Sequence, residues 1–263
     1  MARALLEPWL DDQLVSPSSL RAVVATEASR SRWAQSGLAG SPIQVATDPE
    51  LAWKAPAVLL AVKPQQLQRA AEQASAVGAT PAAGVPGQLL ISILAGVRLE
   101  RLQQLFPNRL CVRAVVNTPA LVRCGLTALA WGGDPPQDQR DWVEHLFRRV
   151  GDVWVLPEGQ LDAFLALTAS GPAFVALVAE SLADGAVAAG LPRPLAQTLA
   201  HRTLAGTAAL LAGKDLHPGE LKDMVSSPSG TTIAGLRQLE RAGVRSALLE
   251  AVLAAAQRSR ELA

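Results

Sequence analysis

The stretch KDMVSSPSGTTIAGLRQLE, residues 222–240, gathers the side chains best suited to binding a small anion. Five hydroxyl groups and a glycine surround one turn, which ends where Thr231 and Thr232 open an expected helix. The first amide groups of a helix have no partner within it, and the helix dipole is positive there. The turn could therefore bind a carboxylate. The alternative is ordinary capping by serine or threonine, which needs only one such side chain.

Four other loops follow expected strands and could also carry chemistry: TEASR (26–30), AVKP (61–64), ILAG (93–96) and VNTPA (116–120). In a doubly wound sheet, ligands bind beyond the carboxyl ends of the strands. Taken alone, each loop also fits an ordinary turn at the end of a strand.

Composition excludes several functional classes. A net charge of +1 gives no basic surface for nucleic acid. The sequence contains no run of 18 uncharged apolar residues, so we expect no membrane span. The three histidines are far apart in sequence, so we expect no metal site. Two cysteines and a start without a signal-peptide pattern favour a reducing cytoplasm over a disulfide or a reactive thiol.

The elements that must position these loops fall into two halves, with a change of periodicity near Pro157. Residues 1–156 alternate short apolar runs with helical patterns, which predicts an α/β domain with a parallel, doubly wound sheet. The expected strands lie at 20–26, 56–62, 88–94, 110–116, 126–131 and 152–156, and the expected helices between them at 48–55, 64–77 and 138–150. Residues 157–263 carry only helical patterns, broken by glycine and proline.

Two helical patterns are unusual. The chain opens with MARALLEPWL, whose apolar spacing predicts a helix, whereas most α/β domains open with a strand. The pattern after Pro172 is almost all Ala, Val, Leu and Gly, and a helix that is apolar nearly all round must be buried on most sides. We therefore expect residues 157–263 to interlock with a second copy, as a homodimer or higher homo-oligomer. A compact monomeric bundle is the alternative.

These stretches, in this order, resemble the pyrroline-5-carboxylate reductase family, and the resemblance covers nearly the whole chain. It is carried by AVKPQ, SILAG, RAVVNTPA, TASGPAFVALVAESLADGAVAAGLPR, HPGELKDMVSSPSGTTIAGLRQLE and RSRELA. The resemblance implies a Rossmann-like dinucleotide-binding domain at residues 1–156 and an all-α dimerisation and substrate-binding domain at 157–263. It also implies an oxidoreductase that reduces 1-pyrroline-5-carboxylate to L-proline, the last step of proline biosynthesis.

The main departure from the family lies at the start. The family begins with a strand and a glycine-rich turn that lead into a helix opening with Met-Ala, and Met1 and Ala2 match that pair. The first strand lies centrally in such a sheet, so its loss implies a central ladder left unpaired and a helix without its phosphate-binding turn. Either the natural protein starts upstream, or this is a truncated form that has lost cofactor affinity.

The resemblance implies substrate binding by Glu158, Asp215, Val225, Ser227, Gly230, Thr231 and Thr232. Ser227, Gly230 and Thr231 would hold the substrate carboxylate. The hydroxyl of Thr232, the expected catalytic residue, would hydrogen-bond the ring nitrogen, and protonation of that nitrogen makes the neighbouring carbon electrophilic. Because a hydroxyl is a weak acid, its role is mainly orientation, with water as the ultimate proton source.

The other three substrate-side residues have weaker support from sequence. Glu158 and Asp215 match acidic positions near the substrate, and Val225 would line its ring. Without the resemblance, the two acids fit a carboxylate at a helix start and a surface charge in a loop.

The resemblance also implies cofactor binding by Thr26, Asp48, Ala61, Val62, Lys63, Pro64, Ala95 and Asn117. Residues 61–64 would pass under the nicotinamide half, with Ala95 and Asn117 nearby, and Thr26 would lie at the ribose end. Glu27 at a strand end favours NAD, because an acid there accepts a ribose hydroxyl. Residues 30 and 32 are arginines that suit the 2′-phosphate of NADP. The family favours NADPH, with NADH as the alternative.

Smaller departures affect fine geometry. Val115 and Val116 replace a Met-Pro pair, residues 168–172 read TASGP where the family has SGSGP, and Ser229 replaces a glycine. Two other functions stay open. One is a related cyclic-imine or 3-hydroxy-acid reductase, although the helix after Pro172 lacks the lysine of the hydroxy-acid enzymes. The other is a non-catalytic dimeric remnant.

Overall fold

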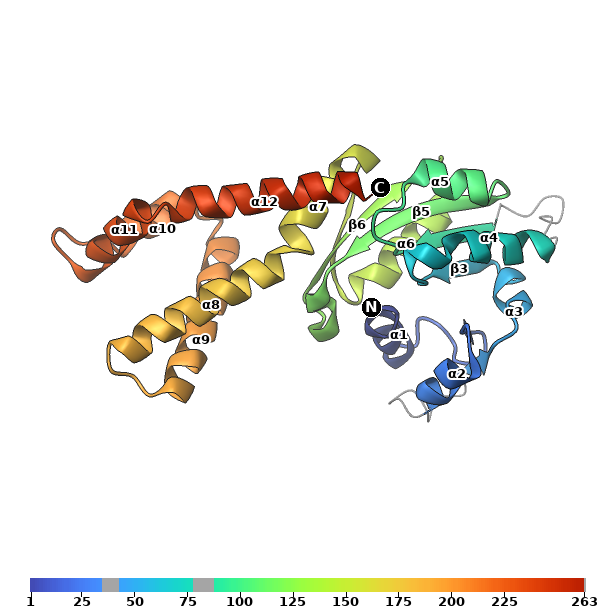
Figure 1. The fold of residues 1–263 in the computed structure, drawn as a ribbon, viewed down its shortest axis with the longest axis horizontal. Helices are drawn as coiled ribbons and strands as arrows, with labels where there is room; N and C mark the ends of the chain where they lie inside the picture. The colour runs from blue at the N-terminus through green and yellow to red at the C-terminus, as the bar shows by residue number, and fades with distance from the viewer. Residues whose placement is uncertain (35–42, 78–87, 263) are drawn as a thin grey trace. The chain divides into compact units, whose positions relative to one another are not determined.

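The computed structural model describes residues 1–34, 43–77 and 88–262. The chain divides into two compact units (Figure 1). The first unit comprises Met1–Ala169 together with Ala256–Ala263, and the second comprises Ser170–Ala255. By this division the second unit begins later than the change of periodicity near residue 157, so the helical segment just after Pro157 packs with the sheet.

The first unit alternates strands and helices. Its elements are α1 (Ala2–Asp11), β1 (Arg21–Val23), α2 (Glu27–Ala34), β2 (Gln44–Ala46), α3 (Glu50–Trp53), β3 (Ala57–Leu60), η2 (Pro64–Gln66), α4 (Leu67–Ala76), β4 (Gln88–Ser92), α5 (Leu99–Leu105), β5 (Arg109–Val116), η3 (Thr118–Val122), β6 (Gly125–Trp131), α6 (Gln137–Arg148), β7 (Gly151–Val155), η4 (Glu158–Gln160) and α7 (Leu161–Thr168). All six strands expected from the sequence are present, and α1 confirms the helical reading of the first ten residues.

A five-stranded sheet in the order β3-β4-β5-β6-β7 forms the centre of this unit. Its pairs are parallel except β5 with β6, which run antiparallel. The expected parallel, doubly wound sheet therefore contains one antiparallel pair. The connection between these two strands is the short η3 segment, and a parallel crossover needs a dozen or more residues. The longer connection through α6 restores parallel pairing between β6 and β7.

Strands β1 and β2 form a separate two-stranded parallel sheet. Strand β2 was not expected, because three residues within the stretch SPIQVATD give no apolar run of strand length. Within the described residues no ladder joins β1 to β3, so the α/β layer is interrupted between them (Figure 1).

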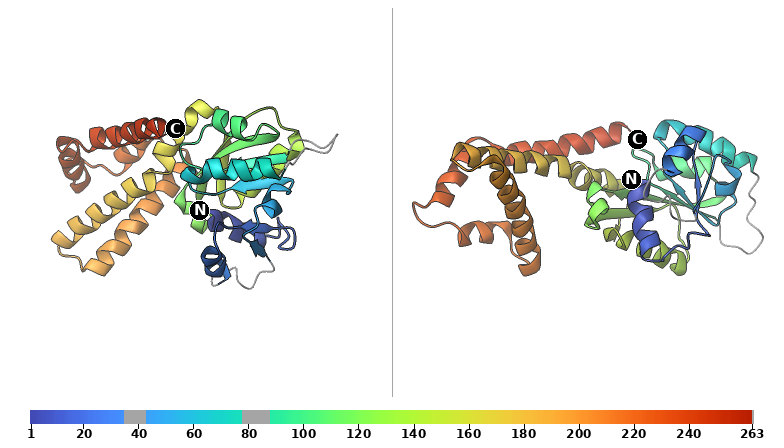
Figure 2. Two further views of the ribbon diagram at one scale, coloured as in Figure 1. Left: turned by 45° about the vertical axis from the view of Figure 1, so that its right-hand side comes forward. Right: turned by 90° about the horizontal axis from the view of Figure 1, so that it is seen from below.

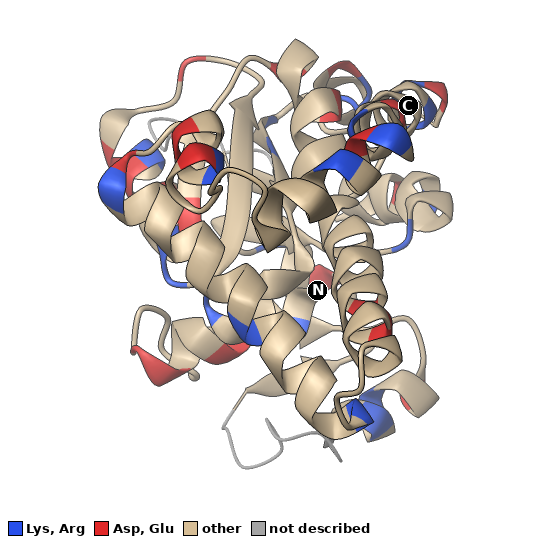
Figure 3. Cartoon of the chain, turned by 90° about the vertical axis from the view of Figure 1, so that its left-hand side faces the viewer, with Lys and Arg blue, Asp and Glu red and all other residues tan. Residues whose placement is uncertain are grey.

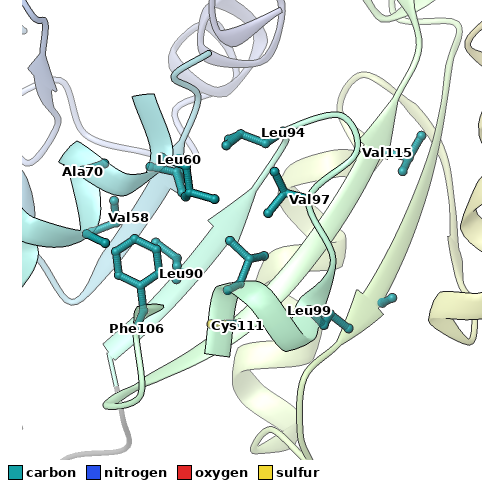
Figure 4. Packing of buried hydrophobic residues seen from close by; sticks show 14 of the residues in the cluster. Val58, Leu60, Ala70, Leu90, Leu94, Val97, Leu99, Phe106, Cys111 and Val115 are labelled. Atoms are coloured by element: carbon teal, nitrogen blue, oxygen red, sulfur yellow. The ribbon is translucent and has the colours of Figure 1, made fainter. Parts of the chain in front are cut away.

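The core lies on both faces of the five-stranded sheet, because alternate residues of each strand point to opposite sides. On β5, Cys111 and Val115 pack against the α4 and α5 side, together with Leu90 and Phe106 (Figure 4). Their neighbour Val112 packs on the opposite side with α1 and α6. The apolar patterns on both faces of these strands thus reflect a layer buried between helices.

Helix α1 is firmly attached to the first unit. Leu5 is fully buried and Trp9 is 3% exposed. The Trp9 indole N–H donates to the Leu146 carbonyl at 2.6 Å, and its ring meets Phe147 edge-on with centroids 5.9 Å apart. These contacts fix α1 against α6.

The C-terminal part of the final helix, α12 (Val244–Glu261), belongs to the first unit from Ala256 onward. There the Ser259 hydroxyl hydrogen-bonds the Asp162 carboxylate at 2.6 Å in a buried position. Gly96, with φ +72°, lies so close to the backbone of Leu262 that a Cβ at residue 96 would be 2.7 Å from the Leu262 carbonyl oxygen. The glycine of the ILAG loop is therefore required by this close approach as well as by its backbone conformation.

The second unit is helical, as expected. Its elements are α8 (Gly171–Ala188), α9 (Arg193–Lys214), α10 (Pro218–Met224), α11 (Thr231–Arg241) and the first part of α12. Helices α8 and α9 lie side by side (Figure 2) and pack through small residues, among them Ala183, Ala196 and Ala200. An ion pair between Asp184 and Arg193 closes their connection.

Much of the apolar surface of α8 is exposed in the single chain. Val175 is 53% exposed and Leu177 is 64% exposed, and charged residues are sparse along α8 (Figure 3). By length and composition alone, the stretch Glu158–Ala188 is apolar enough to cross a membrane, with a mean hydropathy of 1.7 and 17% of its window buried. The chain leaves helical conformation between α7 and α8, so this stretch is not one continuous helix.

Both cysteines are free, and they differ in environment. Burial raises the pKa of the Cys111 thiol to about 11, whereas Cys124 is exposed. We expect a thiol reagent at pH 8 to label Cys124 in the native protein and to leave Cys111 unlabelled until denaturant is added, because only the thiolate reacts. Peptide mass mapping after labelling checks this result. Native labelling of Cys111 at the same rate would contradict it.

Candidate functional site

The start of α11 carries the site suggested by the sequence. Gly230 is the N-cap residue, with φ −76° and ψ 175°, and no side chain caps the helix. Thr231 and Thr232 are the first two helical residues. Ordinary capping by a hydroxyl therefore does not account for this turn, and the first amides of α11 are left for another acceptor.

The turn before α11 is tight. The Gly230 amide donates to the Ser227 carbonyl at 3.0 Å, and Ser229 takes a left-handed conformation with φ +58°. A Cβ at position 230 would lie 2.3 Å from the Ser227 hydroxyl oxygen, so that hydroxyl sits directly beside the helix start. Within the described residues, the Ser226 hydroxyl is buried and has no hydrogen-bond partner. An unsatisfied buried hydroxyl is costly, so this group stands out as a polar atom at the turn that still needs a partner.

Two further expected residues lie in the same unit at the ends of helices. Asp215 follows α9 in a left-handed conformation, with φ 50° and ψ 40°. Val225 follows α10 and is 55% exposed. Among the described residues, no hydrogen bond joins the Asp215 side chain to the turn at residues 226–230, whereas Val225 adjoins that turn in sequence.

Glu158 lies in the first unit and has protein partners there. Its Oε1 atom is 3.1 Å from Nη1 of Arg113 and accepts the Leu99 amide at 2.7 Å. Arg113 is only 2% exposed, and within the described residues its Nε and Nη2 atoms have no hydrogen-bond partner. Sequence reasoning did not single out Arg113, although an arginine inside the apolar strand LCVRAVV was a signal that a buried acid must lie near.

Asn117 is likewise used to hold the fold. Its Nδ2 atom donates to the Thr168 carbonyl at 3.0 Å, and its Oδ1 atom accepts the Leu126 amide at 2.8 Å. The residue is 4% exposed. It therefore ties the end of α7 to the connection between β5 and β6.

A pocket of about 690 Å³ lies at the carboxyl ends of β1 and β3. Thr26, Ala61, Val62 and Lys63, all expected at the cofactor, line it together with Arg3 of α1. The wall also includes two residues of α2, which are Ser29 and Arg32. Three cationic side chains and two hydroxyls around a cavity of this size suit a phosphate-bearing dinucleotide.

The remaining expected cofactor residues do not line this pocket. The Asp48 carboxylate accepts the Glu50 amide at 3.0 Å. Pro64 opens the short helix η2, and Ala95 is exposed in the turn before Gly96. The described residues also contain no group of His, Cys, Asp and Glu side chains that could hold a metal ion.

Comparison with known proteins identifies relatives over most of the chain. Residues 158–262 match the family model described as pyrroline-5-carboxylate reductase dimerisation. A pyrroline-5-carboxylate reductase from Synechocystis sp. is 50% identical over 205 residues, which are 78% of this chain and 74% of that protein. One from Glycine max is 42% identical over 205 residues, covering 78% of this chain and 73% of its own length.

Solved structures agree with the fold. A pyrroline-5-carboxylate reductase from Coxiella burnetii superposes with a TM-score of 0.86 at 28% identity and covers 100% of this chain and 94% of its own. A Plasmodium falciparum pyrroline carboxylate reductase with NADP bound gives a TM-score of 0.84 at 24% identity, covering 98% of this chain and 93% of its own. At that identity the second likeness shows the fold alone.

Proposed function

Since this chain belongs to the pyrroline-5-carboxylate reductase family, we propose that it reduces 1-pyrroline-5-carboxylate to L-proline with hydride from NADPH. The observation that carries this proposal is the start of α11, where helix amides without a side-chain cap adjoin the hydroxyls of Ser227, Thr231 and Thr232. Such a site suits a ligand that has a carboxylate and an adjacent ring nitrogen.

On the substrate side, Ser227, Gly230 and Thr231 hold the carboxylate at the positive end of α11. The Thr232 hydroxyl hydrogen-bonds the ring nitrogen and keeps the imine in one orientation, while a proton reaches that nitrogen from water. Val225 supplies an apolar surface for the ring. Asp215, the other acid that sequence places in this unit, would add charge near the nitrogen.

On the cofactor side, the pocket at the ends of β1 and β3 fits a dinucleotide. The cofactor, when bound, supplies the hydride. Thr26 and the segment from Ala61 to Lys63 would hold it, and Arg32 with Ser29 would bind a 2′-phosphate. The Arg32 side chain already donates to the Ser29 hydroxyl at 3.0 Å, which brings both groups to one point of the wall. This arrangement supports NADPH over NADH.

The chain is a homo-oligomer, since its second half matches a dimerisation family. We propose that the smallest assembly is a homodimer, in which the exposed apolar residues of α8 pack against a second copy of the chain. We also propose a cytoplasmic location, because both cysteine thiols are free, as is usual in a reducing compartment.

NADPH oxidation followed at 340 nm tests the function, with 1-pyrroline-5-carboxylate compared against a six-membered cyclic imino acid. We expect saturable reduction of the five-membered substrate and a clearly higher kcat/KM for it. Equal or better reduction of the six-membered ring would favour a related imine reductase. A folded dimer that binds no dinucleotide would favour a non-catalytic protein.

Thr232→Val tests the role of the hydroxyl. We expect kcat to fall about 10- to 100-fold, because a hydrogen bond to a charged group contributes about 1.5–3 kcal/mol. KM should change less, since the carboxylate donors are intact. Steady-state kinetics at saturating NADPH measures both constants, and Thr207→Val, an exposed threonine of α9, is the matched control. An unchanged kcat in Thr232→Val would remove this residue from the mechanism.

A further inference from the structure

The short helix α10 leads directly into the turn at residues 226–230. It runs from Pro218 to Met224, and none of its residues is buried. The Ser226 amide donates to the Asp223 carbonyl at 3.2 Å, so the last turn of α10 continues into the first residue of the turn. The conformation of residues 226–230 therefore depends on whether α10 is formed.

The start of α10 has a side-chain cap, whereas α9 and α11 start without one. The ring Nδ1 atom of His217 accepts the Gly219 amide at 3.1 Å. The Glu220 carboxylate accepts the His217 amide at 2.8 Å, which completes a capping box. Because a helix of two turns without a buried face is marginal in water, this cap has a large share in deciding whether α10 forms.

The two residues after His217 suit a ring in this place. Pro218 is the first helical residue and has no amide proton, so Gly219 offers the first free amide of α10. A Cβ at residue 219 would lie 3.0 Å from Nδ1 of His217, closer than ordinary van der Waals contact. The glycine thus lets the ring approach the backbone closely enough to accept the amide.

Only the neutral ring can act as this cap. A backbone amide always donates, so Nδ1 of His217 is the unprotonated nitrogen and Nε2 carries the proton. A protonated ring has donors at both nitrogens, and it would place a positive charge at the positive end of the α10 dipole. Histidine is the side chain that ordinarily changes charge between about pH 5 and 8, so acidification removes the cap.

The charged groups around His217 do not replace the lost acceptor. Those nearest to it in the chain are Lys214, Asp215 and Glu220. In the part of the chain that the structure describes, no hydrogen bond or ion pair joins the His217 ring to another element, and toward α11 the interacting charges are Lys222 and Glu240. A carboxylate can offset the charge of a protonated ring, but it does not turn Nδ1 into an acceptor.

We propose that His217 is a positioning residue, whose neutral ring holds α10 and thereby keeps the turn at residues 226–230 in the conformation that binds the substrate carboxylate. This inference rests on the proposed function. Acidification releases the cap and loosens the turn, so substrate binding weakens at low pH through a group that does not touch the substrate. The effect falls mainly on KM, because the turn holds the carboxylate.

Steady-state kinetics of two variants between about pH 5.5 and pH 8 tests the proposal. His217→Asn keeps a capping acceptor that gains no charge, and His217→Ala has no acceptor. At each pH, kcat/KM for 1-pyrroline-5-carboxylate is divided by the value for the wild type, so that effects of pH on the substrate and on NADPH cancel. The matched control is His145→Asn, which changes an exposed histidine of α6.

We expect the two ratios to move in a linked way. The ratio for His217→Asn should be near one at pH 8 and rise about three- to tenfold by pH 5.5, because only the wild type loses its cap. The ratio for His217→Ala should be about three- to tenfold below one at pH 8 and approach one at pH 5.5. The control should give a flat ratio. A flat ratio for His217→Asn would overturn the proposal, and so would an equal loss in both variants at pH 8, which would place the ring itself at the substrate.

Hydrogen exchange of residues 217–230, followed by mass spectrometry, tests the cap without turnover. Wild type and His217→Asn are compared at the same pH, because exchange itself depends on pH. We expect equal exchange at pH 8 and exchange about three- to tenfold faster in the wild type at pH 5.5. If this difference is found in a protein that reduces no imine, the proposed function fails and the pH-dependent cap stands. Equal exchange at pH 5.5 would overturn the role of His217 whatever the activity.

Discussion

Glu158→Ala lowers the free energy of unfolding by about 3 kcal/mol, because it leaves the Arg113 guanidinium charged and without a carboxylate inside the protein. Within the described part of the chain, two of the three guanidinium nitrogen atoms of Arg113 already lack a partner, and Glu158 binds the third. The same substitution removes the acceptor of the Leu99 amide at the start of α5. Urea denaturation followed by circular dichroism measures the loss.

The control for Glu158→Ala is Asp134→Ala, which breaks a pair between Asp134 and Arg140 in which the acid is 94% exposed. We expect that control to change stability by less than about 1 kcal/mol. The double variant Arg113→Met with Glu158→Leu should recover most of the loss, since apolar replacement of a buried pair is often neutral. If Glu158→Ala instead raised KM and matched the control in stability, Glu158 would act on the substrate and the ion pair would be incidental.

Gly230→Ala raises KM for the imine substrate about 10- to 100-fold. A methyl group at residue 230 would lie 2.3 Å from the Ser227 hydroxyl oxygen and displace it from the helix start. The hydroxyl can rotate away, so the fold persists, but the carboxylate then loses a donor that contributes about 1.5–3 kcal/mol. Steady-state kinetics with NADPH at saturation gives KM and kcat separately, and we expect kcat to change less.

Gly235→Ala is the matched control, because that glycine lies in the same helix with no atom within 4 Å of an added methyl group. The combination of Ser227→Ala with Gly230→Ala provides a second check. If the glycine acts through the Ser227 hydroxyl, the double variant should resemble the single variants rather than add their effects. Strict additivity would mean that Gly230 contributes to binding by another route, such as direct approach of the ligand to the backbone.

The strands of the first unit could be predicted from sequence because each combines an apolar run with a flanking break, and a layer buried on both faces gives a strong local signal. Strand β2 could not, since its three residues are stabilised by pairing with β1 rather than by their own pattern. The antiparallel direction of β6 follows from the length of the η3 connection. That length was visible in the sequence, but the alternation of strands and helices favoured the prediction of a parallel sheet.

Part of the candidate site could also be predicted, because that part depends on local sequence. The turn before α11 is local in sequence, so its residue types and spacing determine its geometry. Glu158 and Asn117 depend on partners 45 and 51 residues away, and no local pattern reveals such contacts. The resemblance to a family suggested roles beside the ligands for both residues. The structure shows the protein groups that each one binds, while their roles toward a ligand stay predictions.

The return of Ala256–Leu262 to the first unit makes the helical unit an insertion within the chain of the first. Asp162 and Gly96 are made before the helical unit, whereas Ser259 and Leu262, which contact them, are made after it. These contacts can therefore form only after the chain of the helical unit has been made. Completion of the first unit is thus tied to synthesis of the second.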